Sequence, residues 1–141
     1  MSILSTALVC LALNIYHEAR GEPIKGQYAV ALVTVNRAKF NNRDICKVVY
    51  RPNQFSWTIY KPSVTDPKSY KLAKQVAKDV LDGKVSDFTS ASTYYHADYV
   101  KPVWSKKFRR TIKIGRHQFY SVFPRARVAT KGLHFYGIQS S

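Results

Sequence analysis

The chain contains only two glutamates in 141 residues, Glu18 and Glu22, which lie four positions apart. They follow an apolar stretch, in a protein whose 23 Lys and Arg against 8 Asp and Glu give a formal charge of +15. A carboxyl at the edge of a core loses solvation, which raises its pKa and keeps a proton available near neutral pH. That property suits a general acid in glycoside cleavage. We therefore predict that Glu18 is such an acid, against the alternative of a partly exposed surface glutamate.

The second glutamate is predicted to have a structural role. If the helix continued past Gly21, both carboxyls would share one face, but Gly21 favours a turn that separates them. Arg20 and Arg37 are available as partners, and a Glu22–Arg37 pair would hold the turn after the first helix against the second helix. Asp98 is the best remaining candidate for a second catalytic carboxylate.

Other kinds of catalytic site find little support. The histidines, at positions 17, 96, 117 and 134, lack the spacing of metal ligands. Neither a nucleotide-binding glycine loop nor a G-x-S-x-G motif is present. Acid–base chemistry without a metal or cofactor is the simplest enzymatic interpretation. The two cysteines, Cys10 and Cys46, are too few for a disulfide framework and are expected to be buried free thiols in a reducing compartment.

Hydrophobic periodicity predicts an α+β, mainly helical fold in a single domain over residues 1–141. Helices are expected at 3–20, 25–39, 44–50 and 68–82. Gly21 and Pro23 end the first, while Asp66, Pro67 and Gly83 mark the boundaries of the last.

The remaining segments are predicted to be turns, loops and strands. β-prone stretches at 92–96 and 113–120, the second turning at Gly115, are expected to meet near the site. Asn41-Asn42 is interpreted as a turn, 53–67 as a loop and 84–90 as a connection that could hold another helical turn. The basic tail from 124 to 141 has no clear pattern.

The apolar segment from Met1 to Ile15 is interpreted as the first core helix. It has no basic residues before it and no small-residue cleavage site after it, and it is too short to span a membrane. A role as an export anchor is the weaker alternative.

Composition excludes a disordered chain, since 45% of residues are hydrophobic and 13% aromatic. The positive charge implies an anionic partner, which could be nucleic acid, a membrane face or a cell-wall polymer. Ten tyrosines could line a site for sugars or bases, or simply lie half-buried at the surface.

Several motifs follow one another in an order typical of one family. They are Tyr16-His17-Glu18-Ala19-Arg20-Gly21-Glu22-Pro23, Gly26-Gln27, Val35-Asn36-Arg37, Gln54-Phe55-Ser56-Trp57, Thr93-Tyr94-Tyr95-His96-Ala97, Val100, Pro102, Trp104 and Ile114-Gly115-Arg116-His117-Gln118-Phe119-Tyr120. Over residues 8–122 the chain resembles the SleB-type cell wall hydrolases, the spore-cortex-lytic enzyme family, which also includes phage endolysins.

The resemblance implies a lysozyme-like helical domain with a small β element. It also implies cleavage of the β-1,4 bond between N-acetylmuramic acid and N-acetylglucosamine in peptidoglycan, with Glu18 as acid/base. The walls of the groove would be formed by Gln54, Phe55, Trp57, Tyr95, His96, His117, Phe119 and Tyr120. Tyr94, Tyr95 and Tyr120 could bond to substrate hydroxyl or N-acetyl groups, and Trp57 or Trp104 could stack on a sugar. For Phe55, Trp104 and Phe119, core packing is an equal alternative.

The chain departs from the spore enzymes because it shows neither a separate peptidoglycan-binding domain nor a convincing signal sequence. This favours a compact single-domain phage endolysin, made in the host cytoplasm and released to the wall. A monomer is assumed. Its charge could hold it on the anionic wall or on outer-membrane lipid.

The absence of an obvious second carboxylate favours a lytic transglycosylase, with a hydrolytic muramidase as the alternative. A basic nucleic-acid-binding or membrane-binding protein without catalysis is the competitor from another class. Glu18→Gln separates these classes, because it should stop wall lysis and leave binding intact.

Overall fold

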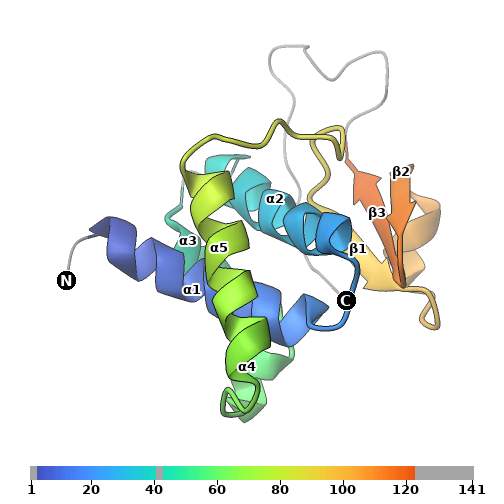
Figure 1. Ribbon diagram of the computed structural model, residues 1–141. Helices are drawn as coiled ribbons and strands as arrows, with labels where there is room; N and C mark the ends of the chain where they lie inside the picture. The colour runs from blue at the N-terminus through green and yellow to red at the C-terminus, as the bar shows by residue number, and fades with distance from the viewer. Residues whose placement is uncertain (1–2, 41–42, 123–141) are drawn as a thin grey trace.

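The computed structural model describes residues 3–40 and 43–122 (Figure 1). The expected turn at Asn41-Asn42 and the tail from 124 onward lie outside the described residues. Within the described part, helices precede a three-stranded antiparallel sheet. The elements are α1 (Ile3–Ala19), α2 (Ile24–Phe40), α3 (Ile45–Val49), α4 (Trp57–Tyr60), α5 (Pro67–Leu81), β1 (Tyr94–Ala97), the 3₁₀ helix η1 (Val103–Lys106), β2 (Arg109–Ile114) and β3 (His117–Ser121).

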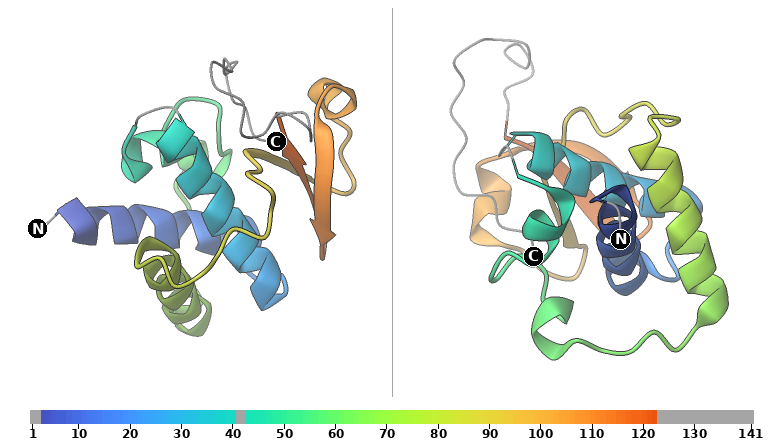
Figure 2. Two further views of the ribbon diagram at one scale, coloured as in Figure 1. Left: turned by 90° about the horizontal axis from the view of Figure 1, so that it is seen from above. Right: turned by 90° about the vertical axis from the view of Figure 1, so that its left-hand side faces the viewer.

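The helices form one layered body, and the sheet packs against one end of it (Figure 2). Helix α1 lies against α2, α3 and α5, and α2 also contacts α5. As its apolar sequence predicts, α2 is buried on most sides, including the whole run 29–34. The core therefore surrounds α1 and α2, and the chain leaves α1 at the edge of the sheet.

The predicted helix boundaries are confirmed. Gly21 ends α1 with a φ of +87°, a left-handed conformation that glycine adopts without strain. Asp66 caps α5 by accepting a hydrogen bond from Ser69 N at 3.2 Å, and Pro67 is its first residue. The buried Tyr16 hydroxyl accepts a bond from Asp66 N at 2.9 Å, so α1 holds the start of α5 in place.

Three local predictions were incomplete. The expected loop 53–67 contains α4, while 84–90 forms no helix. Strand β2 begins at Arg109, before the expected 113. The charged side chains at its start hide the alternation of polar and apolar residues that would predict a strand, and it is the pairing with β3 that reveals it. No helix among the described residues is long and apolar enough to cross a membrane.

The prediction of two free thiols is wrong. Cys10 on α1 and Cys46 on α3 form a disulfide, with their Cα atoms 5.3 Å apart. Their separation of 36 residues gave no sign of this, because only the packing of α3 onto α1 brings the sulfurs together. A structural disulfide is typical of an oxidising compartment, so the cysteines give no reason to expect a reducing one.

The sheet has the strand order β1-β3-β2, with Tyr95 opposite Phe119 and His96 opposite Gln118. Successive side chains on a strand point to opposite faces. Tyr95 and Phe119 belong to the main core beside the helices, whereas Tyr94 and Tyr120 form a second cluster on the outer face. The sheet thus has an inner face toward α1 and an outer face directed away from it.

Candidate active site

Glu18 lies in the last turn of α1, where the helix meets the inner face of the sheet. The Tyr95 hydroxyl donates a hydrogen bond to Glu18 Oε1. Burial raises the pKa of Glu18, and the bond from Tyr95 and the charge of Arg37 only partly oppose this effect. Burial likewise raises the pKa of Tyr95 well above its usual range, so this hydroxyl remains a donor at neutral pH. A carboxyl in this setting can hold a proton and release it to a substrate.

Arg37 and its neighbour Asn36 fix the position of Tyr95. Arg37 Nε donates to Thr93 O at 2.6 Å, and Asn36 Nδ2 donates to Ser92 O at 2.9 Å. These bonds tie the segment before β1 to α2, and β1 then carries Tyr95 to Glu18. Burial lowers the pKa of Arg37 to about 10, so the fully buried guanidinium is still cationic at neutral pH.

Glu22 joins the turn after α1 to the β2–β3 turn. Its Oε1 accepts a bond from Arg116 N at 2.8 Å and lies 3.8 Å from His117 Nδ1. Gly115 has a φ of +55°, and a Cβ there would approach Glu22 Oε1 to 2.6 Å. The expected Glu22–Arg37 pair is wrong, because Glu22 contacts the β2–β3 turn while Arg37 contacts Thr93. Sequence spacing could not reveal that the hairpin packs against this turn.

His117 and Phe119 share the inner face with Tyr95. The ring centroids of His117 and Tyr95 are 5.0 Å apart, and those of Phe119 and Tyr95 are 5.5 Å apart. Burial lowers the pKa of His117, although the charge of Glu22 opposes this. His117 is therefore neutral at pH 7 and sits beside the phenol that bonds to Glu18.

The Gln54-Phe55-Ser56-Trp57 motif lies on the helical side of the site. Trp57 Nε1 donates to Asn14 Oδ1 at 2.8 Å, and its ring lies 4.6 Å from that of His17. Gln54 and Phe55 are buried, and the Arg37 guanidinium lies 5.1 Å from the Phe55 ring. These side chains support the site from beneath and expose little surface to a substrate.

The remaining predicted wall residues lie on the outer face, away from Glu18. His96 Nε2 and the Tyr120 hydroxyl are 2.8 Å apart, and the Tyr94 ring packs 4.7 Å from Trp104. Asp98, the candidate second carboxylate, is exposed at the end of β1, with its Oδ2 3.6 Å from Lys113 Nζ. The sheet therefore lies between these outer-face side chains and the candidate acid Glu18. Alternation along the strands could have predicted this division.

The action of Arg37 on Glu18 was not expected from the sequence. The sequence feature that could have indicated it is a single arginine, Arg37, within the largely apolar helix α2. Among the described residues, no group of three His, Cys, Asp or Glu side chains is placed to hold a metal ion. What the inner face assembles is a carboxyl of raised pKa, a phenolic donor, a neutral imidazole and a buried cation. This set can donate and then recover one proton.

A family model described as Cell Wall Hydrolase matches residues 21–120. The chain belongs to the Cell Wall Hydrolase family, which confirms the resemblance predicted from the motifs. The matched segment includes Arg37, Tyr95 and His117, and Glu18 lies just before it.

Curated relatives include spore cortex-lytic enzymes of Bacillus cereus, 30% identical over 115 residues, and Bacillus subtilis strain 168, 29% identical over 115 residues. These matches cover 77% of the chain and 42% and 35% of the relatives. The chain therefore spans less than half the length of the curated relatives it matches.

Two solved structures are similar over most of the chain. One is the catalytic domain of the germination-specific lytic transglycosylase SleB from Bacillus anthracis, with 31% identity, a TM-score of 0.68 and coverage of 82% of this chain and 93% of that one. The other is the catalytic domain of Bacillus cereus SleB, with 30% identity, a TM-score of 0.69 and coverage of 83% and 91%. The predicted α+β, mainly helical, lysozyme-like fold is confirmed.

Proposed function

We propose that this chain is a lytic transglycosylase that cleaves the β-1,4 bond between N-acetylmuramic acid and N-acetylglucosamine in peptidoglycan. The carrying observation is the Glu18 carboxyl, whose pKa is raised by burial and which accepts a bond from Tyr95. The similarity to the catalytic domain of a lytic transglycosylase supports the reaction type.

Glu18 begins the reaction in its protonated form. It donates the proton to the glycosidic oxygen while the bond from this oxygen to C1 of muramic acid breaks, and oxocarbenium character develops at C1. The Tyr95 hydroxyl stabilises the carboxylate that remains. The 6-hydroxyl of the same sugar then attacks C1, and Glu18 takes its proton. The product is a 1,6-anhydro-muramic acid end, and Glu18 is again protonated.

The positions of the other carboxylates favour transglycosylation over hydrolysis. A hydrolase of either stereochemistry usually places a second carboxylate at a defined separation from the acid. Asp98 lies on the outer face, and Glu22 Oε1 is bound to the β2–β3 turn. A hydrolytic muramidase remains the alternative, with a water molecule in place of the 6-hydroxyl.

The test is digestion of purified peptidoglycan by the wild type, Glu18→Gln and Asp98→Asn, with products identified by mass spectrometry. We expect anhydro-muramic ends from the wild type and Asp98→Asn, and none from Glu18→Gln. Reducing-end products, heavier by one water, would establish a muramidase instead. No glycan product from folded wild-type protein would overturn the enzymatic proposal.

We further propose that the enzyme acts on the wall, outside the cytoplasmic membrane. The Cys10–Cys46 disulfide supports this, because such bonds persist in oxidising compartments. The role as a phage endolysin stays a prediction from the resemblance.

A further inference from the structure

The outer face of the sheet holds a cavity that the proposed reaction does not use. Its volume is ≈ 1030 Å³, and its lining includes His96 and Tyr120 together with residues of the segment 98–113. Tyr95, which directly precedes His96 on β1, points instead to the inner face and bonds to Glu18. The cavity and the candidate acid therefore lie on opposite sides of the same sheet.

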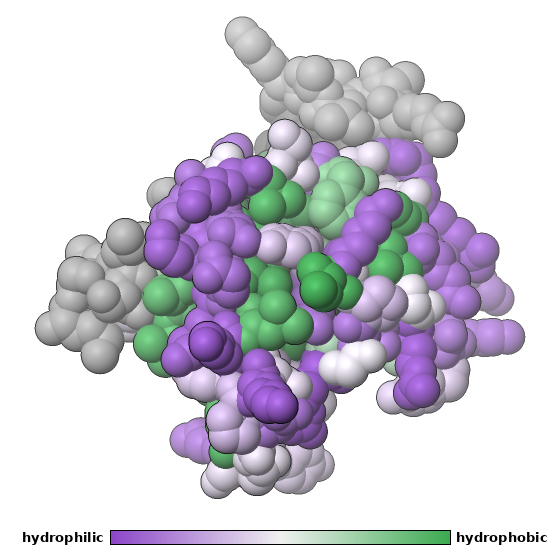
Figure 3. Space-filling model, in the orientation of Figure 1, coloured by the Kyte–Doolittle hydropathy of each residue, from purple (hydrophilic) through white to green (hydrophobic). Residues whose placement is uncertain are grey.

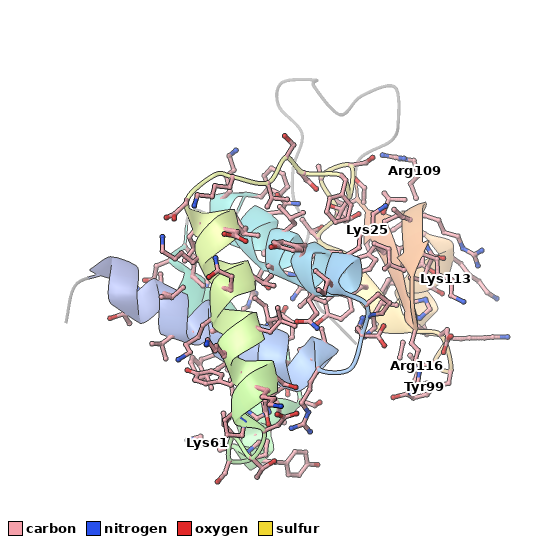
Figure 4. All side chains as sticks on the ribbon, viewed as in Figure 1. Lys25, Lys61, Tyr99, Arg109, Lys113 and Arg116 are labelled. Atoms are coloured by element: carbon pink, nitrogen blue, oxygen red, sulfur yellow. A yellow bond between two sulfur atoms is a disulfide. The ribbon has the colours of Figure 1, made fainter. Side chains whose placement is uncertain are left out.

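Positive charge is concentrated around this cavity. Segment 98–116 carries seven Lys or Arg and one acid, Asp98. Four exposed cations line the cavity: Lys101, Lys106, Arg110 and Lys113. Asp98 pairs with Lys113 at 3.6 Å and offsets one of these seven positive charges, which leaves a net charge of +6 in the segment. Figure 4 shows Arg109, Lys113 and Arg116 spread along the sheet side of the molecule, and hydrophilic residues dominate this edge in Figure 3.

Exposed apolar side chains lie in the same segment. Tyr99 is 80% exposed, Val103 is 86% exposed, and Val100 also reaches the surface. Val100 and Val103 contribute to the cavity lining, and Tyr99 directly follows Asp98, whose N donates to Arg116 O at 2.7 Å. An anionic polymer in water would engage the cations and leave these apolar groups in solvent. A lipid surface accommodates both, because aromatic and aliphatic side chains enter the interface while cations meet the headgroups.

We propose that the outer face of the sheet binds anionic phospholipid. The headgroup phosphate would occupy the cavity among Arg110, Lys113 and Lys106, while Tyr99 and Val103 would enter the interface. Glu18, on the other side of the sheet, would then be directed away from the membrane and toward the glycan. This proposal does not depend on the catalytic one.

The test is sedimentation of the full chain with phosphatidylcholine vesicles, with and without phosphatidylglycerol. We expect binding only when phosphatidylglycerol is present. Arg110→Gln with Lys113→Gln should weaken it ~25-fold, because each charge near such a surface contributes about a fivefold effect. The matched control is Lys68→Gln with Lys71→Gln on the exposed side of α5, which removes the same net charge. It should change binding by less than about twofold, because screening limits the reach of distant charges.

A second pair of variants tests the apolar contribution. Tyr99→Ser should weaken vesicle binding, whereas Tyr60→Ser, at a tyrosine 79% exposed on α4, should not. Circular dichroism and thermal unfolding of all variants report that they are folded, independently of any catalytic activity. Equal losses in the two charge variants, or no wild-type binding to phosphatidylglycerol, would overturn the proposal. If Arg110→Gln with Lys113→Gln sediments less with peptidoglycan but binds vesicles as the wild type does, the outer face binds an anionic wall polymer instead.

Discussion

The helical region, residues 3–81, and the sheet region, residues 94–121, differ in how they are stabilised and charged. The helices hold most of the core and the disulfide, and their Lys and Arg are interspersed with acids. The sheet region carries a single acid, Asp98, among many cations. The helices provide the candidate acid Glu18, and the sheet provides Tyr95 and His117. Glu18 thus has its raised pKa and its hydrogen bond from Tyr95 because it lies where the two regions meet.

The two regions share apolar core packing through Tyr95, Ile114 and Phe119, and a small set of polar contacts fixes their relative position. Arg37 and Asn36 hold the segment before β1, and Glu22 holds the β2–β3 turn. The cationic groups of the sheet lie mainly on its outer face, away from these contacts. This separation lets strong positive charge coexist with a carboxyl whose pKa is raised, because nearby cations would lower it.

The largest expected effect comes from Glu18→Gln, which removes the acid and leaves both regions in place. Wall cleavage should fall ~10²–10⁴-fold, the range of general acid–base catalysis. Stability should change in the opposite direction. Because folding raises the pKa of Glu18, its protonation stabilises the fold fully below about pH 4.5, and this contribution is lost as pH rises through the raised value.

The variant should therefore have a higher Tm than the wild type at alkaline pH and a similar Tm at pH 4. Thermal unfolding between pH 4 and 9 measures this, and Asp98→Asn is the control. A Tm difference that is constant across this range would contradict the assignment of Glu18 as a half-buried carboxyl whose pKa is raised by folding.

Cys10→Ser with Cys46→Ser tests the helical region. The disulfide closes a loop of 36 residues, so its loss should lower the free energy of unfolding by ~4 kcal/mol. Urea unfolding of the double variant and of the reduced wild type should give the same value. If reduction leaves the wild type equally stable, the bond does not form in the protein.

Gly115→Ala tests the junction between the regions. A Cβ there meets Glu22 Oε1 at 2.6 Å and Pro23 Cδ at 2.9 Å, at a positive φ, so we expect a loss of about 3 kcal/mol. Gly83→Ala is the matched control in the helical region, because Gly83 also has a positive φ but has nothing within 4 Å of its Cβ position. It should cost only about 1 kcal/mol. Equal losses in urea unfolding would show that Glu22 does not pack on the turn.

The smallest expected effect is that of Tyr95→Phe. The Tyr95 hydroxyl favours the carboxylate form of Glu18, so its removal should raise the pKa of Glu18 further. The alkaline limb of the pH profile of kcat/KM should move to higher pH, with the maximum rate reduced by less than ~100-fold. Tyr120→Phe, on the outer face, should leave the limb in place. If the alkaline limb of Tyr95→Phe stays at the pH of the wild type, a group other than Glu18 determines it.

Much of the helical region was predictable, because periodicity, Asp66, Pro67 and the glycines at 21 and 83 act locally. Glu18 was predictable as a candidate acid from its place after an apolar run. The partners of Glu22 and Cys10 were not, since each lies on an element that only tertiary packing brings close. The aromatic motifs indicate the correct strands, and the alternation of side chains along a strand is what assigns Tyr94, His96 and Tyr120 to the outer face.

Strand β1 has only four residues, and adjacent positions carry unrelated contacts: Tyr95 bonds to Glu18 and His96 bonds to Tyr120. A slip of one residue in register would move each side chain to the other face. Length variation among natural variants should therefore be excluded between Ser92 and Ala97. It should instead accumulate in exposed connections such as residues 60–63, where an added residue changes neither face of the sheet. In this protein, the number of residues leading into β1 should therefore be as strongly constrained as the identity of the candidate acid Glu18.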